Sequence, residues 1–363
     1  MRTSKLFLIA IIVSISFIYG LGIGVYHWFP YEHIKAVKQH TMGEYFDPAD
    51  TLRNFSFVTT HKNQKYLLNL RDQLLSEIIP NSDSNVVSET NSESETLLQN
   101  TYYGIKTNAV LTRSALQGKC LRIYIQGHGG GNPQDYDYHN ELKRELLSDG
   151  CDVLSMSMLG LGLNAGPASF PSRFGLIKLI KLKHLAPTTH GNYSLFYDAN
   201  NPYLDPLSLF IYPHFKLINH VIGEYEDIAI MGISGGGWYA VWLSALMPEI
   251  LNSISYAGSL PIPYRIFSTN VGDWEQIYSP LYSKVTYFDL YQLMTLNSTD
   301  SFNRKVTLVY NSDDNCCFLN PYAAHFKKYS DNLSSLKYNV IIDESDTHTM
   351  NAELVLSLLE NME

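Results

Sequence analysis

One stretch constrains the fold of this chain more than any other: an apolar run that stops at a glycine-flanked serine and continues as an apolar helical pattern. It reads Ile228-Ala-Ile-Met-Gly-Ile-Ser-Gly-Gly-Gly-Trp-Tyr-Ala, which predicts a strand, a sharp turn at Ser234 and a helix. Glycines at positions 232 and 236 remove side chains that would collide with the backbone in such a strained turn. The turn would expose the Ser234 hydroxyl above the sheet edge, and the helix would direct its first amides and positive dipole end toward it.

The rest of the sequence indicates one large α/β domain over residues 101–363, and the length of 363 residues allows it. Strand-like runs at 121–126 and 151–158 flank a helical pattern at 138–147, which predicts a parallel βαβ unit. We therefore expect a mostly parallel central sheet with helices on both faces. Further helical patterns lie at 207–222, 238–246 and 351–359, and further strand-like runs at 254–257, 305–310 and 336–342.

A second glycine-rich turn, Gly127-His-Gly-Gly-Gly131, follows the strand-like run that ends at residue 126. Bare backbone amides in such a turn can bind the negative oxygen of a tetrahedral intermediate. We expect one donor from Gly129 or Gly130 and the other from Gly235. His128 is expected to hold the loop's shape beside the substrate. No Cys or His spacing typical of a metal site accompanies it, so no metal is expected.

The order of Ser234, an acid after a late strand and His348 after the last strand resembles that of the α/β-hydrolase superfamily. The His-Gly-Gly-Gly turn is similar to that of esterases, lipases and dienelactone-hydrolase-like enzymes within it. The resemblance covers residues 101–363 and consists of motifs and their order. It implies the α/β-hydrolase fold for this domain.

The resemblance also implies roles for individual residues. Ser234 would be the nucleophile and His348 the general base, with a carboxylate that orients the imidazole. The family pattern of strand, Gly, two residues and Asp, with Asn311 in the glycine's place, favours Asp314, and the adjacent Asp313 is the alternative. His348 stands between two threonines instead of following a glycine, which is a departure from the family.

The implied activity is hydrolysis of a carboxylic ester through an acyl-enzyme, without metal or organic cofactor. The same triad could serve an amide, peptide or thioester hydrolase or an acyltransferase, and a catalytically silent fold could serve as an interaction protein. The substrate could be a small-molecule, lipid or polysaccharide ester. A net charge of −9 leaves no basic footprint for nucleic acid, so no nucleic-acid partner is expected.

Residues 159–206 form a long excursion between two predicted elements of the sheet domain. Both of its ends should lie at the carboxyl edge of the sheet, where ligands bind in open parallel sheets. We expect it to form a lid, with Phe196 and Tyr197 lining a substrate pocket. Trp238, just after the serine turn, is expected to contact substrate as well.

The N-terminus carries an apolar run at residues 6–29 without Asp, Glu, Lys or Arg. As a helix it would span roughly 36 Å, enough to cross a bilayer. Arg2 and Lys5 precede it, so we expect residues 1–5 in the cytoplasm and the catalytic domain on the non-cytoplasmic face of the membrane. A cleaved signal peptide is the competing interpretation.

Residues 30–100 connect this anchor to the domain. They contain a helical pattern at 66–79 and then a stretch at 81–100 rich in Ser, Asn, Glu and Thr. Such a composition buries too little apolar surface to order itself, so it predicts a flexible loop.

Four cysteines complete the inventory. Cys120 and Cys151 precede neighbouring strands and could pair in an oxidising compartment. The adjacent Cys316 and Cys317 could be buried apolar filler or a disulfide between neighbours, and filler is the prediction.

Overall fold

The computed structural model describes residues 62–80, 86–165, 207–265, 272–297, 303–314, 316–318, 321–333, 337–345 and 347–360, with Ser16 and Tyr19. The chain divides into two units, residues 1–56 and 57–363. Ser16 and Tyr19 are helical, and the rest of the predicted anchor at 6–29 lies outside the described residues. Within the described residues, no helix has the length and apolar character needed to span a membrane.

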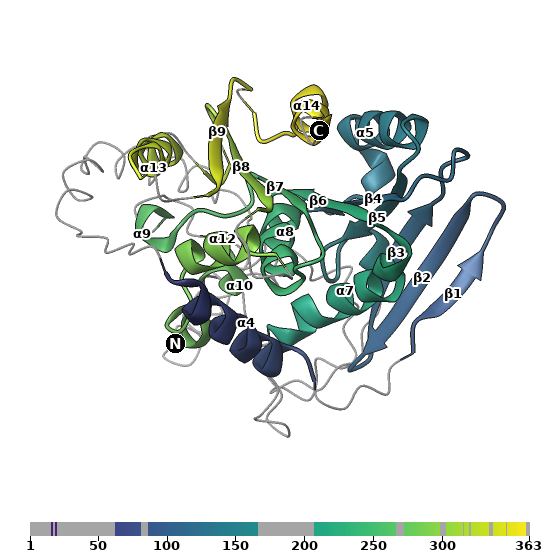
Figure 1. Ribbon diagram of the computed structural model, residues 1–363, viewed down its shortest axis with the longest axis horizontal. Coiled ribbons are helices and arrows are strands. Elements are labelled where there is room, and N and C mark those ends of the chain that lie inside the picture. The colour runs from purple at the N-terminus through teal and green to yellow at the C-terminus, as the bar shows by residue number, and fades with distance from the viewer. Residues whose placement is uncertain are drawn as a thin grey trace, which may run out of the picture. The chain divides into compact units, whose positions relative to one another are not determined.

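A nine-stranded sheet forms the centre of the second unit, in the order β1-β2-β3-β5-β4-β6-β7-β8-β9 (Figure 1). The strands from β5 to β9 in this order run parallel, whereas β1, β2 and β3 pair antiparallel, as do β3 and β5. Their bounds are β1 Ser88–Asn91, β2 Glu95–Tyr102, β3 Ile105–Thr112, β4 Cys120–Gln126, β5 Asp152–Ser157, β6 Asp227–Ile233, β7 Asn252–Tyr256, β8 Lys305–Asn311 and β9 Asn339–Asp343.

Helices cover both faces of this sheet. In Figure 1, α5 and α14 lie on one face, and α7, α8, α12 and α4 lie on the other. Short helices α9, α10 and α11 follow β7, and α13 packs on β9. The bounds are α4 Gln64–Ile78, α5 Asp137–Ser148, α7 Ser208–Val221, α8 Gly235–Leu246, α9 Ile262–Arg265, α10 Trp274–Ile277, α11 Ser279–Tyr282, α12 Tyr287–Thr295, α13 Tyr322–Asp331 and α14 Ala352–Glu360, with 3-10 turns at Pro133–Asp135, Gly162–Asn164 and Ile222–Glu224.

The core is centred on β6 and α8. Every residue of α8 is buried, because the sheet lies on one side of it and α12, α7 and α4 contact the other. A helix that is apolar on all sides is stable in water only in such a position. The parallel strands β4, β5, β6 and β7 are buried along almost their whole length, as expected for a sheet covered on both faces.

The prediction of a flexible loop at 81–100 is wrong for residues 88–100, which form β1 and most of β2. All four residues of β1 are exposed, so polar side chains remain solvated there while the backbone bonds to β2. A polar composition thus marks an exposed sheet edge here. Tyr103 and Gly104, with φ of 49° and 75°, form the hairpin turn between β2 and β3.

The helix predicted at 66–79 is α4, and it belongs to the same compact unit as the sheet. Its Arg71 is buried and donates to the carbonyl oxygens of Ala245, Leu293 and Leu296 at 2.8–3.0 Å. These bonds satisfy carbonyl groups at the ends of α8 and α12, which would otherwise lack partners. Residues 64–78 are therefore a structural layer of the domain.

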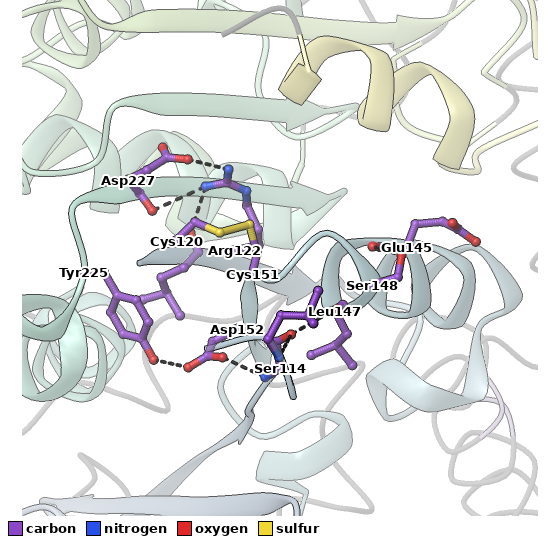
Figure 2. The surroundings of a disulfide bond; sticks show 12 residues. Ser114, Cys120, Arg122, Glu145, Leu147, Ser148, Cys151, Asp152, Tyr225 and Asp227 are labelled. Carbon is purple, nitrogen blue, oxygen red and sulfur yellow. Dashed lines mark hydrogen bonds and ion pairs between the residues drawn. A yellow bond between two sulfur atoms is a disulfide. The ribbon is translucent and has the colours of Figure 1, made fainter. Parts of the chain in front are cut away.

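A disulfide joins Cys120, at the start of β4, to Cys151, just before β5 (Figure 2). Beside it the Asp152 carboxylate accepts from the Tyr225 hydroxyl at 2.7 Å and the Ser114 amide at 2.8 Å. The Cys120–Cys151 pairing, left open by the sequence, is therefore present. It covalently links the amino ends of two central strands, at the opposite ends of these strands from the Ser234 turn.

Candidate active site

Ser234 occupies the turn between β6 and α8. Its φ of 56° and ψ of −129° form a strained conformation for a residue with a side chain. The Ser234 amide donates to the Tyr256 carbonyl at 2.9 Å, and its carbonyl accepts from the Trp238 amide at 3.1 Å. Bonds from β7 and from α8 thus hold the turn on both sides.

Close packing explains the two glycines around this serine. A Cβ added to Gly232 would lie 2.3 Å from the Gly236 oxygen, and one added to Gly236 would lie 1.9 Å from the Ile125 oxygen. Both contacts are far shorter than atoms in a packed interior allow. A side chain at either position would therefore push β6, α8 or β4 apart and move Ser234.

The loop at 127–131 crosses the start of α8. A Cβ on Gly127 would lie 2.3 Å from the Ile233 oxygen and 2.9 Å from the Gly235 nitrogen, so the loop needs glycine to approach the serine turn. Gly130 has a φ of 80°. Within the described residues, the amides of Gly129 and Gly235 donate to no other group of the protein.

His348 pairs with Asp314, and the two follow β9 and β8. His348 Nδ1 lies 2.7 Å from Asp314 Oδ2, and Asp314 Oδ1 accepts from the amides of Cys316 and Cys317 at 2.8 and 2.9 Å. Burial alone would raise the pKa of the Asp314 carboxyl, but the bond and charge of His348 and the two amides hold it below its usual range. Asp314 is therefore a carboxylate at neutral pH, and it accepts the Nδ1 proton.

The second nitrogen of the His348 ring is buried. Among the described residues, His348 Nε2 has no hydrogen-bond partner. Because Nδ1 carries the proton toward Asp314, Nε2 presents a lone pair in the neutral ring. This atom is the base that the carboxylate orients.

A polar network fixes the loop that carries His348. The Asn311 side chain donates to the Ser345 hydroxyl at 2.6 Å and to the Thr349 carbonyl at 2.9 Å. Ser345 and the Tyr256 hydroxyl both donate to the Asp343 carboxylate at the end of β9. Asn311 thus links β8 directly to the histidine loop.

His128 belongs to a separate charged cluster. Its Nε2 lies 2.8 Å from Asp273 Oδ2 and 3.2 Å from Glu275 Oε1, and the Glu275 side chain is fully buried. Burial lowers the pKa of His128, but the bonds and charges of the two carboxylates outweigh this effect and raise it to about 10. His128 is therefore an imidazolium at neutral pH. The ligand atoms of the three groups lie within 4.8 Å of one another, a spacing that a metal ion could use.

One cavity of about 340 Å³ is lined by the serine, by His348 and by His128. Ser234, His348, His128 and Gly129 line it, together with Arg265, Gly272, Asp273, Gln276, Cys316, Cys317 and Phe318. Its volume is that of a small-molecule site. It lies at the carboxyl ends of the parallel strands, as expected for an open α/β sheet.

Comparison with solved structures identifies similar folds. A candidate acetyl xylan esterase from Bacteroides fragilis superposes with a TM-score of 0.51 at 12% identity, covering 83% of this chain and 88% of that chain. The chain has an α/β-hydrolase fold. Acetyl xylan esterase 1 from Thermoanaerobacterium sp. gives 0.49 at 14% identity, covering 84% and 96%, and a glucuronoyl esterase from Caldicellulosiruptor kristjansonii gives 0.47 at 13%, covering 82% and 83%. No protein-family model matches the sequence, and no curated protein matches it.

The α/β-hydrolase domain brings Ser234, His348, His128 and Gly129 to one cavity, with Asp314 behind His348. Asp313, the alternative acid, is exposed at the surface. Phe196 and Tyr197, with residues 166–206 of the predicted lid, lie outside the described residues.

Two sequence predictions differ from the structure. Trp238, predicted to contact substrate, is fully buried in α8 and donates to the Tyr282 hydroxyl at 2.9 Å, because α8 is enclosed on every side. Cys316 and Cys317, predicted as filler, form a disulfide with each other. Both of their amides bind one oxygen of Asp314, and this tight turn brings the neighbouring sulfurs together.

Other residues of the cavity were not predicted at all. Asp273 and Gln276 come from an aromatic segment without a motif, as does Glu275 of the His128 cluster, and no motif marks Arg265 or Phe318. The sequence does contain one signal for this cluster. In a sequence with few charged residues, Asp273 and Glu275 flank Trp274 immediately after Gly272.

Proposed function

We propose that this chain is a serine hydrolase that cleaves carboxylic esters through an acyl-enzyme. The observation that carries the proposal is His348, whose Nδ1 bonds the ionised Asp314 while its buried Nε2 has no partner among the described residues. Ser234 lines the same cavity in a strained turn. The Ser234 hydroxyl supplies the proton donor that Nε2 lacks.

The first half of the reaction forms an ester on Ser234. The Ser234 oxygen bonds to the substrate carbonyl carbon as its proton passes to His348 Nε2, and the carbonyl electron pair moves onto oxygen. The amides of Gly129 and Gly235 bind this oxyanion. When the carbonyl reforms, the bond to the leaving alcohol breaks, and His348 returns the proton to that alcohol. Asp314 stabilises the imidazolium meanwhile.

The second half releases the acid. A water molecule gives a proton to His348 and bonds to the acyl carbon, and the bond to Ser234 then breaks as His348 reprotonates the serine oxygen. An ester is the first substrate class to test, because the structurally similar protein from B. fragilis is described as a candidate acetyl xylan esterase. Small-molecule and polysaccharide esters both fit this expectation, whereas an amide or thioester substrate would use the same steps.

A fluorophosphonate probe tests the proposal, because it labels only a serine activated by a base. We expect labelling of the full chain at Ser234, identified by mass spectrometry of the labelled peptide. The Ser234→Ala variant is the matched control and should stay unlabelled. A folded wild-type chain without labelling would favour the alternative of a silent hydrolase fold that serves as an interaction protein.

We also propose that residues 6–29 anchor the enzyme in a membrane, with the catalytic domain on the non-cytoplasmic face. The apolar run, the preceding Arg2 and Lys5, and two disulfides in the domain support this arrangement, since disulfides persist in oxidising compartments. Alkaline carbonate extraction should leave the full-length chain in the membrane pellet. Release into the supernatant would contradict the anchor, and a mature N-terminus near residues 21–30 would indicate a cleaved signal peptide instead.

A further inference from the structure

Four arginine side chains are buried in the described part of the chain, and one of them differs from the rest. Arg71 and Arg304 donate to backbone carbonyls of the domain core, and Arg122 pairs with Asp227. Each of these three guanidinium groups bonds to the protein itself, although Arg122 Nε has no partner among the described residues. Arg265 is 2% exposed, yet its Nε and Nη1 have no hydrogen-bond partner among the described residues.

The surroundings of Arg265 hold the guanidinium in place without pairing it. The Phe318 ring lies under it, with the guanidinium carbon 4.7 Å from the ring centroid. A Cβ on Gly272 would lie 2.4 Å from Arg265 Nη2, so the backbone at Gly272 packs closely against the guanidinium. Arginine remains protonated in proteins, so a fixed positive charge stands in the wall of the cavity.

The acidic groups near Arg265 do not bond to it. Asp273 and Glu275 lie close enough to act on its charge, but both bind the imidazolium of His128, at 2.8 and 3.2 Å. Within the described residues, no ion pair reaches Arg265. Gln276, which lines the same cavity, also has a buried Oε1 without a partner there.

Buried polar groups in native proteins are nearly always hydrogen-bonded, and an unpaired buried charge is strongly unfavourable. A buried guanidinium with two unpaired nitrogens in the wall of this cavity therefore points to a ligand, and the ligand must reach a wall that Ser234 and His348 also line. A carboxylate is the group that best matches a guanidinium, because it accepts two parallel charge-assisted bonds.

We propose that the substrate is an ester that carries a carboxylate elsewhere in the molecule, and that Arg265 binds this carboxylate while Ser234 attacks the ester. This inference rests on the proposed function. Arg265 would thereby select a half-ester of a dicarboxylic acid or an ester of a hydroxy acid over neutral esters of the same size. Neutral analogues would leave the guanidinium unpaired. A buried polar group that loses its partner discriminates between substrates more strongly than an apolar pocket does.

Two substrate pairs test the proposal with the full chain. 4-Nitrophenyl hydrogen glutarate is compared with the 4-nitrophenyl ester of glutaric acid monoamide, which places the charge in the acyl part. 4-Acetoxybenzoate is compared with 4-acetoxybenzamide, which places it in the leaving alcohol. We expect kcat/KM to favour the carboxylate member of at least one pair by roughly 10- to 100-fold. Ratios near one in both pairs would overturn the proposal.

Two variants assign the preference to the residue. Arg265→Gln should bring the favoured ratio close to one, and Arg265→Lys should keep part of it. Arg144→Gln, an exposed position of α5, makes the same charge change away from the cavity and should keep the wild-type ratio. A ratio unchanged in Arg265→Gln would also overturn the proposal.

A binding measurement covers the case in which Arg265→Gln does not fold. In the Ser234→Ala chain, glutarate should raise Tm in a concentration-dependent way, and glutaramide should not. Absence of that difference contradicts the inference without any need for turnover. Fluorophosphonate labelling of the wild-type chain separates the two proposals: labelling without carboxylate preference overturns the role of Arg265 alone, whereas a folded chain that is not labelled overturns the hydrolase itself.

Discussion

Two histidines line the same cavity, and they differ in which ring nitrogen their carboxylate partners contact. His348 bonds a single carboxylate, Asp314, through Nδ1, and its Nε2 is left without a partner among the described residues. His128 meets two carboxylates, Asp273 and Glu275, and both contact the same nitrogen, Nε2. The first arrangement orients a ring and leaves a base available, and the second holds a proton in place.

The difference shows that the number of carboxylates matters less than the nitrogen that they contact. Two acids on one nitrogen raise the pKa of His128 to about 10, so this ring cannot accept a proton from serine at neutral pH. It can act only as a fixed positive charge. A Cβ on Gly235 would lie 2.6 Å from His128 Cε1, so this charge lies beside one of the proposed oxyanion donors.

Replacing each histidine by alanine tests this comparison most directly. His348→Ala removes the base and should lower kcat by roughly 10⁵- to 10⁶-fold, as loss of a triad histidine does elsewhere. His128→Ala should have a far smaller effect, because it removes only a nearby charge and a packing contact. Steady-state kinetics on one chromogenic ester measures both. Equal losses in two folded variants would show that the proposed division of roles is wrong.

The two adjacent carboxylates after β8 provide the second test. Asp314→Asn keeps the shape but no longer accepts the Nδ1 proton, so the ring adopts the wrong tautomer and kcat should fall by roughly 10³- to 10⁴-fold. Asp313→Asn, at the exposed neighbour, is the matched control and should change kcat by less than about twofold. The reverse order of effects would move the acid by one residue.

Much of this fold could be predicted, because the strongest signals are local. The Ser234 turn needs glycines at fixed spacing, and the packing around Gly232 and Gly236 shows why. The buried parallel strands can also be recognised in the sequence as continuous apolar runs. The edge strand β1 could not be predicted in this way, since its residues are all exposed and its bonds depend on β2.

The site was harder to predict where partners come from distant segments. Ser234, Asp314 and His348 follow strands in a recognisable order, whereas Asp273 and Glu275 have no motif around them. His128 and Glu275, for example, are separated by 147 positions in the sequence. Only the folded sheet brings such segments together.

Removal of one carboxylate from His128 gives the third test. Asp273→Asn should weaken the hold on the imidazolium and lower kcat/KM by roughly tenfold, through the electrostatic environment of the oxyanion. Asp331→Asn on the exposed side of α13 makes the same chemical change far from the cavity and should leave kcat/KM unchanged. If Asp273→Asn also has no effect, the charge on His128 contributes nothing to the reaction, and the cluster serves only the structure.

The last test concerns stability instead of activity: it measures how the free energy of unfolding depends on pH. His128 has a folded pKa of about 10 against an ordinary value near 6.5, so the folded state binds this proton more tightly than the unfolded state. The resulting stabilisation is complete below about pH 6.5 and is lost as pH rises through about 10.

We therefore expect the free energy of unfolding to fall between pH 7 and pH 10 by on the order of a few kcal/mol more in the wild type than in His128→Gln. Chemical denaturation at each pH measures both chains. Asp314 does not contribute in this range, because its pKa is lowered and its stabilisation is lost only in acid. Parallel curves for the two chains across this window would mean that His128 is not held protonated, and the distinction between the two histidines would then rest on geometry alone.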